Sequence, residues 1–259
     1  MIPDIAVLGA GSWGTALAIL LARNGHRVRL WGHEPAAMRA MADTGENRDY
    51  LPGVRFPDGL EAVSELDAAL AADDLLVVVP SHAFREVLER IRNRVRELGR
   101  LIWGTKGLEM ASGRLLHQVA AEVLGDGVAC AVVSGPTFAG EVARGLPTAA
   151  TVAAADPSVA EHFAALLRGE TFRAYTSDDR IGLELGGAIK NVLAIAAGIS
   201  DGLGFGANSR AALITRGLVE MMRLGEALGG QRETFMGLSG IGDLVLTCTD
   251  DQSRNRRLG

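Results

Sequence analysis

The fold of this 259-residue chain is decided by one stretch near its start, Ala6-Val7-Leu8-Gly9-Ala10-Gly11-Ser12-Trp13-Gly14-Thr15-Ala16-Leu17. An apolar run leads directly into a glycine-rich turn, and an Ala- and Leu-rich pattern of helical type follows. The stretch therefore predicts a strand, a tight turn and a helix. Gly9, Gly11 and Gly14 have the spacing G-x-G-x-x-G. Gly9 permits the sharp turn, Gly11 lets backbone approach a pyrophosphate, and Gly14 lets the helix pack closely on its strand.

The amides that open such a helix point at an anion, and the helix dipole favours negative charge there. A glycine turn of this spacing also arises for steric reasons alone. Here both the preceding strand pattern and the following helix pattern are present. The stretch therefore favours a dinucleotide-binding site.

The second expected strand, Arg27–Trp31, bears on which dinucleotide is bound. In a strict NAD fingerprint an acidic residue ends this strand and binds the ribose hydroxyls. This chain has Gly32-His33-Glu34 instead. His33 could contact an adenosine 2′-phosphate, and Glu34 could turn towards a ribose. The stretch could equally cap a following helix, so the choice between NAD and NADP stays open.

Composition limits the class of protein. The chain is 48% hydrophobic with few aromatic residues, which suits an α/β enzyme with close helix–sheet packing. A net charge of −5 argues against a nucleic-acid or membrane-surface binder, whose surface should be basic. Cys130 and Cys248 are far apart and lie in apolar runs, so we expect buried thiols in a reducing compartment.

The sequence shows neither the pattern of a signal peptide nor that of a membrane span. The N-terminus lacks a basic leader, and its glycine turn interrupts the apolar core that a signal peptide needs. No apolar stretch approaches the roughly 20 residues of a membrane span. Ala188–Ile199 is the longest, and Lys190 and Asn191 interrupt it. We therefore expect a cytoplasmic protein without membrane insertion.

The pattern of the chain changes near Ser177-Asp178-Asp179. Before it, strands alternate with helices; after it, long helical patterns take over, and Asp178 or Asp179 is a ready N-cap. We expect an α/β fold with a Rossmann-type, mostly parallel sheet domain over residues 1–178 and a mainly helical domain over residues 179–259. The further strands are expected at Asp74–Pro80, Arg100–Thr105, Val128–Ser134, Thr148–Ala153 and Thr171–Thr176. The further helices are expected at Ala36–Asp43, about 81–98, Val159–Leu167, Ile181–Ile199 and Ser209–Leu228, with a loop at Glu46–Pro57 that could include a short strand.

Two turns follow strands of the expected sheet. Ligands of an open parallel sheet bind beyond the carboxyl ends of its strands. Lys106 comes directly after one strand, where it could hold a phosphate or take part in chemistry, or simply be solvated. Gly135 and Thr137 follow the next strand and offer backbone amides and a hydroxyl. That turn could contact substrate or nicotinamide, or be a tight crossover.

Two charged residues in the helical half could carry chemistry. Lys190 shares a helix face with Gly186 and Gly187, and no acid lies three or four residues away. It either reaches solvent or is partly desolvated, which would lower its pKa and suit proton transfer. The glycines indicate that another helix or a ligand approaches that backbone closely. Asp243 could be a helix N-cap, or it could orient a lysine or a substrate hydroxyl.

A basic run near the end, Ser253-Arg254-Asn255-Arg256-Arg257, places a capping residue before clustered guanidinium groups. A helix start combined with arginine binds phosphate well. A short basic run is also common on a solvated surface. We expect no metal site.

Taken together, these segments resemble the bacterial NAD(P)-dependent glycerol-3-phosphate dehydrogenase family over the whole chain. The similarity lies in the order and spacing of Gly9–Ala16, Thr105–Glu109, Ser134–Ala139, Lys190-Asn191, Gly202–Gly206, Gly242–Leu244 and Ser253–Arg256.

The resemblance implies a reaction and a set of roles. The reaction is hydride transfer between NAD or NADP and the pair dihydroxyacetone phosphate and sn-glycerol 3-phosphate, supplying phospholipid synthesis. Lys190 would be the proton acceptor in alcohol oxidation, and Lys106 would touch both cofactor and substrate. The resemblance places Gly135, Thr137, Asp243, Ser253, Arg254 and Asn255 around the glycerol phosphate. It places Ser12, Trp13, His33, Lys106, Ala139 and Arg254 against the dinucleotide.

Members of that family continue beyond Gly259 with more helix, so the resemblance implies a carboxyl-terminal truncation. The expected partner is a phosphorylated small molecule and not nucleic acid, and a homodimer stays open. A β-hydroxyacid dehydrogenase is one rival, because it also joins a dinucleotide domain to a helix-borne lysine. A dinucleotide-sensing module without turnover is the other, although a sensor has no need of Lys106, Lys190 and Asp243 together.

Overall fold

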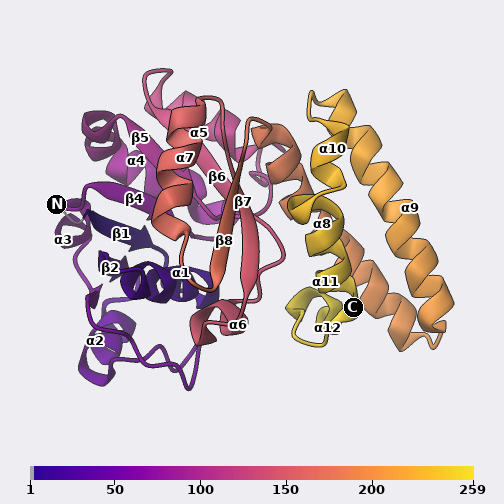
Figure 1. Cartoon of the computed structure of the whole chain (residues 1–259), viewed down its shortest axis with the longest axis horizontal. Helices are drawn as coiled ribbons and strands as arrows, with labels where there is room; N and C mark the ends of the chain where they lie inside the picture. The colour runs from indigo at the N-terminus through magenta and orange to yellow at the C-terminus, as the bar shows by residue number, and fades with distance from the viewer. Residues whose placement is uncertain (1–2) are drawn as a thin grey trace.

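A computed structural model describes residues 3–259, in which one eight-stranded sheet is followed by a group of helices (Figure 1). The sheet has the order β3-β2-β1-β4-β5-β6-β7-β8, and only β7 runs antiparallel to its neighbour β6, while β8 runs parallel to β7. The fold is therefore the mostly parallel, Rossmann-type sheet with a helical part that the sequence predicts. The strands are β1 (Asp4–Leu8), β2 (Arg27–Trp31), β3 (Leu60–Val63), β4 (Asp74–Val77), β5 (Arg100–Trp103), β6 (Ala129–Ser134), β7 (Thr148–Ala154) and β8 (Phe172–Ser177).

Helices cover both faces of the sheet, and each face has its own apolar core. The expected strands and helices are confirmed to within a few residues. Among residues 3–178 the sequence interpretation missed β3, α3 and α5, and the first two are only four and five residues long, too short to show a clear period. One face carries α1 (Ser12–Arg23), α2 (Pro35–Thr44), α6 (Ala139–Arg144) and α7 (Pro157–Leu167). The other carries α3 (Leu66–Leu70), α4 (Ser81–Leu98) and α5 (Leu116–Leu124).

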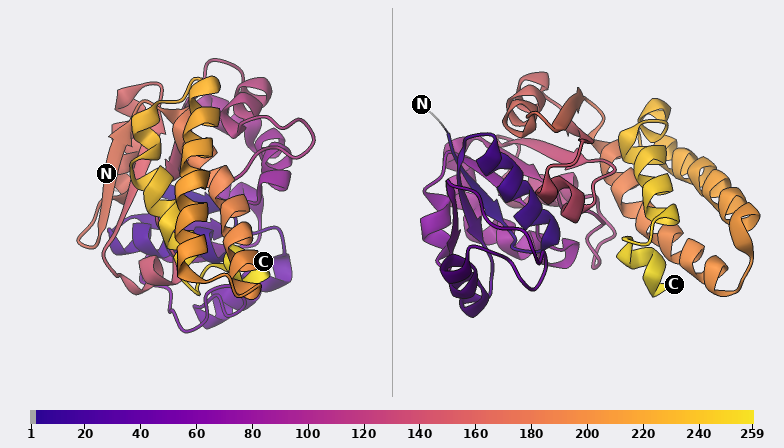
Figure 2. Two further views of the ribbon diagram at one scale, coloured as in Figure 1. Left: turned by 90° about the vertical axis from the view of Figure 1, so that its right-hand side faces the viewer. Right: turned by 60° about the horizontal axis from the view of Figure 1, so that its bottom comes forward.

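The helical part stands at one end of the molecule, where its orange and yellow ribbons lie side by side (Figure 2). Asp179 is the N-cap of its first helix: the carboxylate accepts hydrogen bonds from the amides of Gly182 and Gln231, both at 2.8 Å. A third apolar core lies between these helices. They are α8 (Arg180–Gly202), α9 (Gly206–Ala227), α10 (Arg232–Phe235), a π-helical turn η1 (Leu238–Gly242), α11 (Asp243–Thr249) and α12 (Arg254–Leu258).

Helix α8 connects the two parts, because it packs on β6 and β7 as well as on α9, α11 and α12. The helix has 23 residues, and its most apolar window of 18 residues has a mean hydropathy of 1.3, so it has the length and composition of a membrane span. This corrects the expectation drawn from Ala188–Ile199 alone. However, 56% of its apolar window is buried inside the protein. That burial is typical of a core helix.

The two cysteines are free thiols, as expected. Cys248 is buried, whereas Cys130 is only half-buried, so the expectation of two buried thiols is wrong for Cys130. Burial raises the pKa of Cys130 to about 12 and that of Cys248 to about 11. Neither thiol is therefore a reactive nucleophile at neutral pH.

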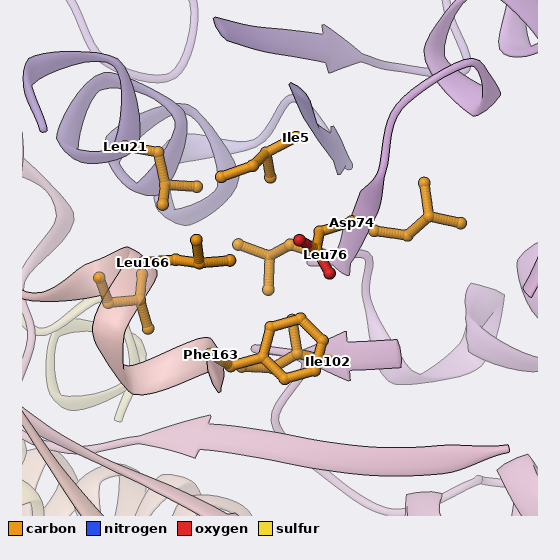
Figure 3. Close-up of a pocket in the computed structure, with 9 residues that line it drawn as sticks. Ile5, Leu21, Asp74, Leu76, Ile102, Phe163 and Leu166 are labelled. Atoms are coloured by element: carbon orange, nitrogen blue, oxygen red, sulfur yellow. The ribbon is translucent and has the colours of Figure 1, made fainter. Parts of the chain in front are cut away.

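A small apolar cavity lies between α1, α7 and the sheet (Figure 3). Its volume of about 10 Å³ suits a single water molecule at most. Its one charged lining residue, Asp74, already binds Arg100 at 2.7 Å and His162 at 3.0 Å. Because the first residue of β4 lies here, the cavity is at the amino ends of the strands, away from the edge where ligands bind.

Candidate active site

A buried cluster of three charged side chains joins the two parts of the molecule. Lys106 follows β5, Lys190 lies on α8, and Asp243 is the first residue of α11. The Lys106 ammonium donates to one oxygen of Asp243 at 2.7 Å, and the Lys190 ammonium donates to the other at 2.5 Å. The side chain of Lys106 is 19% exposed, that of Lys190 is 10% exposed and that of Asp243 is 1% exposed. One carboxylate therefore holds two ammonium groups that are 84 positions apart in the chain.

These are the only two lysines among the chain's 26 lysine and arginine residues. Arginine stays charged at any accessible pH, whereas lysine can give up its proton when it is buried. Every other fixed cation of this protein is an arginine. Both lysines of the chain thus contact the same carboxylate, that of Asp243.

The electrostatics of the cluster favour proton exchange at Lys190. Burial, reinforced by the like charge of Lys106, lowers the pKa of Lys190 to about 7, although Asp243 pulls it the other way. Burial alone would raise the pKa of Asp243, but the charges of Lys106 and then Lys190 outweigh it and lower that pKa. Asp243 therefore stays an anion, while Lys190 exchanges its proton near neutral pH.

The glycines beside Lys190 make the cluster possible. A Cβ on Gly186 would lie 2.3 Å from the Ser239 carbonyl oxygen, and one on Gly187 would lie 3.5 Å from Cγ of Lys106. The groups that pack closely on this face of α8 thus belong to the protein itself: they are the backbone of η1 and the aliphatic part of Lys106. Asp243 is not an N-cap, since that position belongs to Gly242, so the lysine-orienting alternative is the one observed.

Sequence reasoning missed one member of the cluster. The hydroxyl of Thr247 accepts a hydrogen bond from the Lys190 ammonium at 3.2 Å and is buried. Its spacing of four residues from Asp243 places both on one face of α11. That spacing is the feature of the sequence from which the position of Thr247 beside Asp243 could have been predicted.

The glycine turn between β1 and α1 has the shape of a pyrophosphate cradle. Gly9 has φ +127°, and a Cβ there would lie 2.4 Å from the Val78 oxygen. A Cβ on Gly14 would lie 1.9 Å from the Gly9 oxygen, so the helix packs against its own turn. A Cβ on Gly11 would meet nothing within 4 Å. The space over Gly11, at the start of α1 with Ser12 and Trp13, is therefore open to a ligand.

An unused hydrogen-bond donor lies near this turn. The indole Nε1 of Trp13 is buried and has no hydrogen-bond partner among residues 3–259. It lies next to Gly104, two residues before Lys106. A buried donor without a partner is costly, so its position fits a ligand that supplies an acceptor.

The turn after β6 touches the same cluster. The Gly135 carbonyl accepts from the Lys106 ammonium at 3.3 Å and from the Thr137 hydroxyl at 3.2 Å. A Cβ on Gly135 would lie 2.9 Å from Cα of Ala150, so this turn is also a tight crossover. Ala139 opens α6 directly after it.

The basic run lies on α12, which packs on α8 and α11. The Ser253 hydroxyl caps α12 by accepting from the amide of Arg256 at 3.2 Å, and Asn255 donates to the side chain of Asn191 at 2.8 Å. Arg256 is not free for a phosphate, because it binds Asp201 at 2.7 Å and also Asp251. Arg254 is exposed beside the capped start of this helix.

His33 lies apart from the cluster, directly after β2. Its side chain is 83% exposed and lies 3.5 Å from the Glu34 carboxylate.

A pyrophosphate cradle at one edge of the sheet and a titrating lysine at the joint with the helices are the parts of a nicotinamide-dependent oxidoreductase. Comparison with known proteins specifies the class. Two family models match: "NAD-dependent glycerol-3-phosphate dehydrogenase N-terminus" over residues 4–160 and "NAD-dependent glycerol-3-phosphate dehydrogenase C-terminus" over residues 179–259. The chain belongs to the NAD-dependent glycerol-3-phosphate dehydrogenase family.

Individual relatives agree with this. The "Glycerol-3-phosphate dehydrogenase [NAD(P)+]" of Thioalkalivibrio sulfidiphilus is 66% identical over 99% of this chain and 78% of its own length. That of Klebsiella pneumoniae subsp. pneumoniae is 61% identical over 98% and 76%. The crystal structure of the Coxiella burnetii glycerol-3-phosphate dehydrogenase has a TM-score of 0.95 and 54% identity, covering 99% of this chain and 78% of that one.

Proposed function

We propose that Lys106, Asp243 and Lys190 form the catalytic centre at which this chain interconverts dihydroxyacetone phosphate and sn-glycerol 3-phosphate. The observation that carries this proposal is the single buried carboxylate between the chain's only two lysines. The reaction needs a proton at the central oxygen of the substrate and positive charge beside that oxygen while it is an alkoxide. Two ammonium groups on one carboxylate supply both.

Lys190 is the proton donor to that oxygen in ketone reduction and the acceptor in alcohol oxidation. Its pKa of about 7 matches both directions near neutral pH. Lys106 supplies the second positive charge, and Asp243 holds both ammonium groups in place. Thr247 gives the Lys190 ammonium a second fixed acceptor, which orients its remaining hydrogens.

NAD(P), when bound, supplies or accepts the hydride. Gly9, Gly11 and Gly14 would hold its pyrophosphate, with the open space over Gly11 as the supporting observation. The further cofactor contacts we propose are Ser12, Trp13, His33, Lys106, Ala139 and Arg254.

The substrate phosphate would lie at the capped start of α12, where Arg254 supplies charge and Ser253 and Asn255 position the backbone. Gly135 and Thr137 would approach the glycerol part from the turn after β6. Residues 1–178 then form the dinucleotide-binding domain and residues 179–259 form the substrate domain. The reaction takes place at the interface between the two domains.

We infer a cytoplasmic enzyme whose product feeds phospholipid synthesis. The free thiols support a reducing compartment, and the burial of α8 within the helical part supports the absence of membrane insertion. A homodimer is a further expectation for this chain.

The decisive experiment is Lys190→Ala, assayed by the absorbance of NADPH with dihydroxyacetone phosphate. Loss of a general acid–base group should lower kcat by about 10²–10⁴-fold. Binding of NADPH, followed by its fluorescence, should persist. Near-normal turnover of the variant would rule out this assignment, and Arg92→Ala, on an exposed site of α4, controls for loss of a cation elsewhere.

A further inference from the structure

One buried serine connects the helical part to the sheet beside the catalytic cluster. The hydroxyl of Ser239 donates a hydrogen bond to the Ser134 carbonyl at 3.1 Å. Both residues are buried, and Ser134 is the last residue of β6. The next carbonyl along the chain, that of Gly135, accepts from the Lys106 ammonium. The hydrogen bond of Ser239 therefore reaches the sheet one residue from the turn that contacts Lys106.

Ser239 lies on the segment that carries Asp243. It is part of η1, and α11 begins with Asp243 directly after η1. The amide of Gly242 donates to the Gly237 carbonyl at 3.2 Å, five residues earlier, which is the pattern of a π-helical turn. Such turns are rare and are frequently found at functional sites. Because no loop separates η1 from α11, a shift of Ser239 would also move the Asp243 carboxylate.

The backbone of η1 is held against α8 by a separate contact. A Cβ on Gly186 would lie 2.3 Å from the Ser239 carbonyl oxygen, so helix and turn are in direct contact. Lys190 lies on the same helix as Gly186. This packing therefore keeps Asp243 close to Lys190. It does not fix the distance from Asp243 to Lys106, which lies on the sheet side of the interface.

The contact between Asp243 and Lys106 needs a fixed point on the sheet. A lysine side chain is a poor one, because its four-carbon stem is flexible. The backbone at the end of β6 is a better one, since β6 pairs with β5 on one side and with β7 on the other. The hydroxyl of Ser239 binds this backbone directly.

We propose that Ser239 is a positioning residue of the catalytic centre, because its hydrogen bond to the end of β6 sets the distance between Asp243 and Lys106. This inference rests on the proposed function and adds a residue to it. Ser239 acts through Asp243, and its own hydroxyl takes no part in the proton transfer.

Loss of this hydroxyl has a definite electrostatic consequence. Asp243 stays beside Lys190, whereas Lys106 is no longer held at the same distance. The charged groups that act on Lys190 are Lys106, which lowers its pKa, and Asp243, which raises it. The Cys248 thiol on α11 stays neutral, because burial raises its pKa to about 11. With the like charge of Lys106 further away, the pKa of Lys190 should rise.

The test is Ser239→Ala, in which the titration of Lys190 is followed by NMR of lysine labelled at Cε. The pKa of Lys190 should rise by about half a unit to one unit, part of the effect of a like charge in contact. Oxidation of sn-glycerol 3-phosphate needs the neutral amine, so the acid limb of its kcat profile should move upward by the same amount. At pH 7 this lowers kcat for oxidation by about twofold to fivefold, with little change in KM.

Two further variants separate positioning from general stability. Ser239→Cys keeps the size of the side chain and a weak donor, so it should shift the pKa of Lys190 in the same direction by a smaller amount. Ser200→Ala, at a buried serine ten positions beyond Lys190 on α8, should leave the pKa and the kcat profile unchanged. An unchanged pKa of Lys190 in both Ser239 variants would overturn the inference even if both were less stable. If Ser239→Ala does not fold, Ser239→Cys decides by the same criterion.

Failure of the proposed function gives a different result. In that case Lys190 of the unsubstituted chain titrates near 10.5, or Lys190→Ala keeps its turnover. If Lys190 behaves as proposed and the Ser239 variants leave its pKa unchanged, only the role of Ser239 is wrong.

Discussion

The pKa of Lys190 can be moved in two opposite directions by changing its two charged neighbours. Asp243→Asn removes the carboxylate that favours the ammonium form, so the pKa of Lys190 should fall below about 7. Lys106→Met removes the like charge that opposes this form, so the pKa should rise. A purely structural ion pair on the surface would show neither large shift.

The magnitudes follow from the geometry. A shift from 10.5 to about 7 means that the folded protein favours the neutral amine by on the order of 5 kcal/mol. Two unit charges in contact at an effective dielectric constant of about 20 also interact by on the order of 5 kcal/mol. Water that enters around the asparagine reduces this, so we expect a fall of at least about one pH unit in Asp243→Asn. The rise in Lys106→Met should be of similar size.

The chain offers an unusually clean assay, because it has two lysines. Lysine isotopically labelled at Cε gives two side-chain NMR signals, and Lys106→Met leaves one, which assigns both. The signal of Lys190 should titrate near pH 7. A midpoint near the ordinary value of 10.5, or shifts of the same sign in both variants, would refute the reasoning.

The same shift has a consequence for stability. The pKa of Lys190 is lower in the folded than in the unfolded chain, so between about pH 7 and 10.5 the unfolded chain binds more protons. The contribution of Lys190 to the free energy of unfolding should therefore rise with pH across that window. Lys190→Met should remove this rise in denaturant titrations made at several pH values.

Two further substitutions test how the cluster is held. Thr247→Val removes the hydroxyl acceptor but keeps the volume; we expect a several-fold lower kcat with little change in KM, whereas Thr249→Val, on the exposed side of α11, should leave kcat unchanged. Gly186→Ala places a Cβ 2.3 Å from the Ser239 oxygen; it should lower the free energy of unfolding by about 1–3 kcal/mol and reduce activity, because α8 and η1 must separate. Gly202→Ala, whose Cβ would have its nearest neighbour at 3.9 Å, should be neutral or slightly stabilising in the same denaturation assay.

The parts of this structure that the sequence predicts are those with a strong local signal. The continuous apolar run that begins in β4 and extends to Val79, the glycine turn before α1 and the cap at Asp179 each follow from neighbouring residues. Strand β3 and helix α3 could not be found in this way, because each is held by contacts with distant parts of the sheet.

For the candidate site, the sequence identifies the residues but leaves their partners open. Nothing near Asp243 in the chain says whether its carboxylate caps a helix or binds a lysine. That choice depends on the glycines of α8, which bring η1 within contact of the helix and so carry Asp243 to Lys190. The arginine run shows a second limit of the sequence, because its guanidinium groups cannot be told apart there. In the structure Arg256 forms an ion pair with Asp201, whereas Arg254 is exposed.

The distribution of cations over the whole chain supports the catalytic assignment independently of any distance. Arginine serves in the ion pairs seen elsewhere, from Asp4 to Glu220, and it binds carboxylates through a fixed fork. At Lys106 and Lys190 an arginine would keep the charge but could not release a proton or lose it on burial. The restriction of lysine to the surroundings of Asp243 therefore fits the proposed role of Lys190, in which one of the two cations must release and regain a proton.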